Sequence, residues 1–224
     1  MGANPYSPES NLACTRGGEQ DGPRHPKSFA SLLDLNRQTI ALLVDIAATP
    51  LSDRIWSPWR TLDHELGRLD VTRREYLARC SFSLVDLSLR EAPRWSPTNH
   101  VEPAQAELPF SPILLQTRLD HLAHAAYLLA WHLVRSDLIA ARLVFAMNST
   151  SNSLMAQVTL TDIRRIAQEQ VCNGRVRPRW HNRPDVWSRL IHTAHSSHRD
   201  TFANVTTRGL QLFLQELLAD EHGA

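Results

Sequence analysis

One stripe of apolar residues constrains the fold of this chain more than any other feature. Between residues 113 and 134 the apolar positions recur at intervals of four, three, four, three and four residues, at Leu115, Leu119, Leu122, Ala126, Leu129 and Leu133. That spacing is typical of a helix that buries one face against antiparallel neighbours. Because Tyr127, Ala130 and Val134 widen the stripe, we expect a central helix that is covered on most sides.

The same region is apolar enough to raise the question of a membrane span. The unbroken run over residues 122–134 includes His124 and His132 and lies between Asp120 and Arg135. A helix that spans a bilayer needs roughly 20 apolar residues, so the run predicts a core helix and no membrane contact. The N-terminus has no basic region followed by an apolar one, and we expect no secretory signal.

The rest of the chain favours an all-α fold, a multi-helix bundle. Residues 1–27 are rich in proline and glycine with few large apolar residues, which predicts a disordered tail. The five prolines of residues 92–112 exclude a regular element and indicate a Pro-rich linker. We therefore expect a helical N-terminal layer at 28–91 and a helical C-terminal bundle at 113–220, with the option that the two pack as one domain.

Local patterns indicate where two of the helices begin. Thr72 and Glu75 have the spacing of a capping box, with threonine at the N-cap. Thr159 and Asp162 indicate a second helix start. The stretch 82–90 fits either the alternation of a strand or one face of a helix. We expect a helix there, because no neighbouring segment offers a strand partner.

Composition narrows the functional classes. Hydrophobic residues make up 42% of the chain, charged residues 21%, and the formal net charge is +1, so the molecule is not a polycation that binds nucleic acid by charge alone. Cys14, Cys80 and Cys172 are far apart in the sequence. Their spacing excludes a cysteine zinc cluster and a disulfide framework, and it favours a reducing cytoplasm.

The sequence contains no catalytic or cofactor-binding motif. It has no G-x-S-x-G, phosphate-binding loop or dinucleotide fingerprint. His192, His195 and His198 stand three residues apart, as do His121 and His124, and imidazoles at that spacing can bind one metal ion. Because no H-E-x-x-H or similar grouping accompanies them, we expect surface histidines, with no metal, no cofactor and no catalytic residues.

Residues 173–187, NGRVRPRWHNRPDVW, form the most distinctive polar cluster of the chain. Arginine reaches phosphates and tryptophan stacks on bases, so this basic segment is a candidate site for duplex DNA. The alternative is a connector laid across the bundle, anchored by tryptophan, whose arginines pair with acids or lie along the surface. The candidate nucleic-acid-binding residues are Arg175, Arg177, Arg179, Trp180 and Arg183.

The last expected helix is apolar on two faces. One face carries Gly209, whose missing side chain favours close approach of a neighbouring helix. The other face is formed by Leu210, Leu214 and Leu218, and a helix with two apolar faces must bury both. We expect this second face to meet the same helix of a twin subunit in a homo-oligomer, with the helix of residues 28–48 as the alternative partner.

Two stretches, AYLLAWHLVRSDLIAARLVFAM and VTLTDIRRIAQEQVC, resemble FlhD, the small helical subunit of the bacterial flagellar master regulator. Together they cover about a fifth of the chain. The resemblance implies a dimeric regulatory protein that acts with partners, and it places Cys172 at a dimer contact. Residues 28–112 have no counterpart in that small family. The matched positions are Tyr127, Leu128, Leu129, Leu133, Asp137, Ala140, Thr159, Leu160, Ala167, Val171 and Cys172.

The leading hypothesis is therefore a bacterial cytoplasmic protein of regulation or interaction. It resembles FlhD-like transcriptional regulators, acts through helix-mediated association with a regulatory protein partner, and has the basic segment as its candidate DNA contact. The alternative is a non-catalytic helical adaptor that binds a protein partner without DNA. An enzyme of unknown type is the third hypothesis.

Overall fold

The computed structural model describes residues 27–48, 60–91, 95 and 113–195, together with positions 203, 204, 206, 207, 209–211 and 214. The expected N-terminal tail lies outside the described residues except for its last position. The expected Pro-rich linker lies outside them except for Trp95, which is buried.

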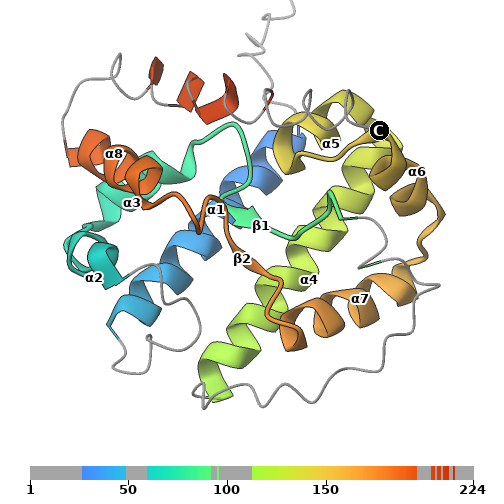
Figure 1. The fold of residues 1–224 in the computed structure, drawn as a ribbon, viewed down its shortest axis with the longest axis horizontal. Helices are drawn as coiled ribbons and strands as arrows, with labels where there is room; N and C mark the ends of the chain where they lie inside the picture. The colour runs from blue at the N-terminus through green and yellow to red at the C-terminus, as the bar shows by residue number, and fades with distance from the viewer. Residues whose placement is uncertain are drawn as a thin grey trace, which may run out of the picture.

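Helices form nearly all of the regular structure in these ranges, which confirms the all-α class (Figure 1). They are α1 (Lys27–Ala47), α2 (Arg60–Gly67), α3 (Val71–Ala78), α4 (Ile113–Ser136), α5 (Leu138–Phe145), α6 (Ser149–Gln157), α7 (Leu160–Cys172) and α8 (Pro184–His195). Two short strands, β1 (Val85–Asp86) and β2 (Arg177–Pro178), complete the elements, and several residues between 203 and 211 are helical.

The central helix is α4, as the apolar stripe predicts. All six residues of that stripe are buried, and so are Tyr127 and Ala130. α4 packs against α1, α5, α6 and α7, and Figure 1 shows it running between α1 on one side and α7 on the other. Among the described helices, none has the length and apolar character that crossing a membrane requires.

The N-terminal helices and the C-terminal bundle share one hydrophobic core. α1 packs on α2, α3 and α4, while α8 packs on α2 and α3. A continuous cluster of buried side chains extends from Leu32 in α1 to Ile191 in α8. Residues far apart in the sequence therefore depend on each other for burial.

The capping box expected at Thr72 and Glu75 is wrong. The N-cap of α3 is Asp70, whose side chain accepts a hydrogen bond from the backbone N–H of Arg73 at 2.8 Å. Aspartate is at least as good an N-cap as threonine, and it comes first in the chain. Glu75 instead accepts three short hydrogen bonds from Arg37 of α1, and these bonds lower the pKa of its carboxyl group.

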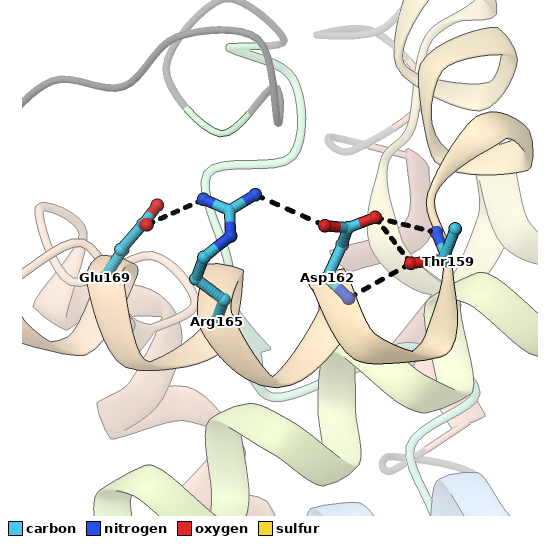
Figure 2. Close-up of polar contacts among 4 residues, drawn as sticks. All are labelled: Thr159, Asp162, Arg165 and Glu169. Atoms are coloured by element: carbon cyan, nitrogen blue, oxygen red, sulfur yellow. Dashed lines mark hydrogen bonds and ion pairs between the residues drawn. The ribbon is translucent and has the colours of Figure 1, made fainter.

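The helix start expected at Thr159 is confirmed, and it is a full capping box. The backbone N–H of Asp162 donates to the hydroxyl of Thr159 at 3.3 Å, and the N–H of Thr159 donates to Asp162 at 3.2 Å. The hydroxyl of Thr159 also donates to the carboxylate of Asp162 at 2.5 Å. This bond, followed by the one from the backbone N–H of Thr159, lowers the pKa of the Asp162 carboxyl group. Figure 2 shows how Arg165 then bridges Asp162 and Glu169 along the same face of α7.

The helix expected over residues 82–90 is wrong, because none of these residues is helical and only Val85 and Asp86 form a strand. β1 pairs with β2 in antiparallel register, Val85 opposite Pro178 and Asp86 opposite Arg177. The strand partner, β2, lies far away in the sequence, so the residues that neighbour the stretch 82–90 do not reveal it. Most of the side chains between residues 80 and 89 are buried, and we refer to residues 80–91 as the buried segment.

Asn36 of α1 forms hydrogen bonds to backbone groups at the start of the buried segment. Its amide nitrogen donates to the carbonyl oxygens of Ala78 and Cys80 at 3.2 Å and of Phe82 at 3.0 Å, and its oxygen accepts from the N–H of Leu84 at 2.9 Å. The Asn36 side chain is completely buried. Buried backbone groups must find hydrogen-bond partners. Here one side chain supplies the partners that a neighbouring strand would otherwise provide.

Side chains from elsewhere in the chain form hydrogen bonds to the backbone carbonyls in the second half of the buried segment. The hydroxyl of Tyr127 in α4 donates to the carbonyl of Leu87 at 2.9 Å, and burial raises the pKa of this phenol. The carbonyl of Leu89 accepts from the hydroxyl of Ser151 in α6 and from the indole N–H of Trp95. The buried segment is thus joined by hydrogen bonds to three helices.

Candidate functional site

Two of the five candidate nucleic-acid-binding residues point into the core. Arg179 is 6% exposed, and its guanidinium donates to the carbonyls of Ser83 and Val144. Trp180 is 7% exposed, and its ring meets Phe82 edge-on with the centroids 5.1 Å apart. Burial of Arg179 and Trp180 leaves them no surface for a phosphate or a base.

The remaining candidates lie nearer the surface and are engaged locally. Arg183 pairs with Asp185 at 3.1 Å, which lowers the pKa of that carboxyl group. Arg177 donates to the carbonyl of Gly174 at 2.7 Å and lies 3.3 Å from a ring nitrogen of His181. Desolvation, followed by the charge of Arg177, lowers the pKa of His181. Arg175 is half-buried, so the basic segment presents only part of its charge outward.

The close approach of a second helix expected at Gly209 is wrong, although Gly209 does have close neighbours. A Cβ atom built there would lie 3.0 Å from Cη2 of Trp180 and 3.4 Å from Cζ of Phe82. The neighbour is an indole ring, however, and not the backbone of a second helix. Trp180 itself has a φ of 54°, in the left-handed region, and its ring is buried beside Gly209 and Phe82.

The candidate association residues have partners within the chain. Leu210 and Leu214 are half-buried and pack against Ala146, at the end of α5. Within the chain, this neighbour differs from the helix of residues 28–48, which the sequence suggests as the alternative partner. Leu218 lies outside the described residues. Cys172 is a half-buried free thiol at the end of α7, and Cys80 is a buried one whose pKa desolvation raises to about 12.

An open, largely apolar groove lies between α1 and α4, and nothing in the sequence spacing predicts it. Its volume is about 670 Å³, with one wall formed by α1 between Ala30 and Gln38 and the other by α4 between Ala125 and His132. Leu128 is 39% exposed within it. The first half of α1 thus lies beside the second half of α4 without closing the space between them.

The α4 wall of this groove is held rigidly. The indole N–H of Trp131 donates to the carbonyl of Val158 at 2.8 Å, and the guanidinium of Arg135 lies 4.3 Å from the centre of the indole ring. Arg135 also donates to the carbonyl of Ala156 at 2.9 Å. Both contacts attach the wall to the junction of α6 and α7, so the ring has little freedom to turn.

A smaller pocket, of about 260 Å³, lies between α2 and α8 and contains two of the histidines singled out in the sequence. His192 and His195 line it together with Glu65, Arg68 and Ile191. Both histidines are exposed, as expected, and so are His121 and His124 on α4; His198 is not described. Within the described ranges, no three His, Cys, Asp or Glu side chains are arranged to hold a metal ion.

The positions that resemble FlhD are mainly packing positions. Tyr127, Leu129 and Leu133 of α4 are buried in the core, whereas Leu128 and Leu160 are exposed. Leu128 and Leu129 both line the groove, and Leu128 is the exposed one of the two. Comparison of the chain with protein-family models, with curated proteins and with solved structures found no match.

Proposed function

We propose that this chain is a helical interaction protein that receives an amphipathic helix of a protein partner in the groove between α1 and α4. The observation that carries the proposal is the groove itself, which is open, largely apolar and lined by two helices, α1 and α4. Hydrophobic grooves of this kind bind the apolar face of a helix through anchors at positions i, i+3 or i+4, and i+7.

The dimensions and polarity of the groove suit such a partner. The α1 wall extends from Ala30 to Gln38, which at 1.5 Å per residue is about 12 Å, a little over two helical turns. Asp34 lies on this wall and accepts a hydrogen bond from Gln38 at 2.8 Å. A basic residue beside the apolar face of the partner helix would meet this carboxylate.

Rigidity of the α4 wall favours tight binding. Ordering a flexible side chain at an interface costs about 0.5–1.5 kcal/mol. Trp131 is already fixed by its hydrogen bond to Val158 and by Arg135 above its ring, so it loses little freedom when a partner arrives. Leu128, exposed beside it, supplies apolar surface that binding would remove from water.

A regulatory role in the cytoplasm of a bacterium is part of the proposal. The resemblance to FlhD implies a protein that acts with partners, and its first stretch coincides with the α4 wall of the groove. The free thiols of Cys80 and Cys172 are compatible with a reducing compartment. A non-catalytic adaptor without a DNA contact fits the same groove, and it is favoured by the burial of Arg179 and Trp180.

Substitution of Leu128 tests the groove. A displayed library of amphipathic helical peptides is selected against the full chain, and the enriched peptides are measured by calorimetry. We expect Leu128→Glu to weaken their binding by about tenfold or more, because a charge then stands among apolar anchors. The matched control is Leu138→Glu, since Leu138 is 50% exposed on α5 and outside the groove. Equal affinity for Leu128→Glu and the unchanged chain would refute the proposal, as would equal losses in both variants.

Duplex DNA provides a second test, directed at the basic segment. We expect no retention of the duplex in mobility-shift assays even at low salt, because Arg179 and Trp180 are buried and Arg183 is paired with Asp185. If the duplex is retained, and if the double substitution Arg177→Ala and Arg183→Ala then removes about two units of salt slope, the basic segment is a DNA contact after all.

A further inference from the structure

The smaller pocket, between α2 and α8, is a second candidate site, and it shares no lining residue with the groove. Its surface is largely apolar, like that of the groove, but ionisable side chains line it. Glu65 comes from α2, Arg68 from the turn that follows it, and Ile191, His192 and His195 from α8. Four of these five side chains are ionisable. The pocket therefore offers both signs of charge in a small space at a helix contact.

Glu65 supplies the acceptor of the pocket. Its Oε2 atom is buried and has no hydrogen-bond partner among the described residues. An unsatisfied buried oxygen is costly, more so when it is charged. Native proteins keep few such atoms, and each calls for an explanation such as a bound water, ion or ligand. Oε2 of Glu65 thus points to an occupant that donates a hydrogen bond.

Arg68, His192 and His195 are the donor side chains that line the pocket. Arg68 follows Glu65 by three residues, yet neither side chain forms an ion pair within the part of the chain that the structure describes. His192 and His195 are one turn apart on α8 and so share a face. All three are exposed. The pocket thus combines one buried, unpartnered acceptor atom with three exposed donor side chains.

We propose that this pocket binds a small free α-amino acid. The ammonium group donates to the buried Oε2 of Glu65. The carboxylate accepts a bidentate pair of hydrogen bonds from Arg68 and lies beside the imidazoles, while Ile191 contacts an aliphatic side chain. Drug-sized ligands need about 300–1,000 Å³, so a pocket of about 260 Å³ suits a molecule of this smaller class.

Calorimetry on the full chain with the proteinogenic L-α-amino acids tests the ligand class. We expect at least one of them to bind. Its decarboxylated amine and its deaminated acid should each bind about tenfold more weakly or worse, because each lacks one of the two charged contacts. Inorganic phosphate and Zn²⁺ serve as further probes. The proposal would be overturned if phosphate or Zn²⁺ bound while no amino acid did. It would also be overturned if no amino acid bound at a concentration of about 10 mM.

Conservative variants test the residues. Glu65→Gln and Arg68→Gln are each expected to weaken amino-acid binding by about tenfold or more, with the helical circular dichroism unchanged. Glu169→Gln on α7 is the matched control and should bind as the unchanged chain does, because Glu169 does not line the pocket. Undiminished binding by Glu65→Gln would overturn the assignment. Such a failure would leave the groove proposal intact, since the two sites have no residue in common.

Discussion

Replacement of Asn36 by leucine is expected to lower the free energy of unfolding by about 4 kcal/mol or more. Asn36 makes four hydrogen bonds to the backbone of residues 78–84. Leucine has the same branched shape and number of heavy atoms but is bulkier and has no polar atoms, so three carbonyl oxygens and the N–H of Leu84 would lose this partner in a buried place. Each unsatisfied buried group costs about 1–3 kcal/mol, and the total stability of a domain is only about 5–15 kcal/mol.

Denaturant unfolding followed by circular dichroism measures this loss. Gln38→Leu is the matched control, because Gln38 is an exposed residue on the same helix, and surface substitutions usually change stability by about 0.5 kcal/mol or less. A loss below about 1 kcal/mol for Asn36→Leu would show that water or a shifted backbone can satisfy the buried segment without this amide. The long-range account of the fold would then be wrong.

The helical part of this fold could be predicted from local patterns because helices satisfy their own backbone. The stripe from Leu115 to Leu133 identifies α4, and Thr159 with Asp162 identifies the start of α7. Both patterns depend on residues within a few turns of each other. The error at Thr72 is of the same local kind, since Asp70 is an equally good cap two residues earlier.

The buried segment could not be predicted in that way. Its strand partner, Arg177–Pro178, follows it by more than 90 residues. Its backbone partners are single side chains on α1, α4 and α6, and no periodicity marks an asparagine or a tyrosine for this role. The only local indication of an irregular structure is that the stretch 82–90 fits strand and helix equally well.

The candidate sites show the same limit. The groove depends on the distance between α1 and α4. The sequence predicts which helix faces are apolar, but it does not predict how closely those faces pack. The smaller pocket brings together Glu65 and His195, which are distant in sequence. In the basic segment, composition correctly predicts the positive charge, but it does not predict which arginine side chains face solvent and which face the core. Arg177 and Arg179 both alternate with apolar neighbours, yet one is exposed and the other is buried.

Replacement of Arg179 by alanine is expected to lower the free energy of unfolding by about 3 kcal/mol. The carbonyl of Ser83 would lose its bond from the guanidinium, at a cost of about 1–3 kcal/mol. The removed side chain would also leave a space beside the buried segment, and the stem of a buried arginine contributes packing as well as charge. For a chain of this length, 3 kcal/mol corresponds to a fall in Tm of roughly 6–12 °C.

Arg177→Ala is the matched control for Arg179→Ala, because the two arginines stand two residues apart and Arg177 is exposed. Its Tm should stay within about 2 °C of the unchanged chain, as is usual for a surface substitution. Arg179→Met adds a useful comparison, since it keeps the packing volume and removes only the hydrogen bonds, so its loss should be smaller than that of alanine. If Arg179→Ala instead leaves the Tm unchanged and weakens binding to duplex DNA, then Arg179 faces a ligand in solution and its burial in the core is wrong.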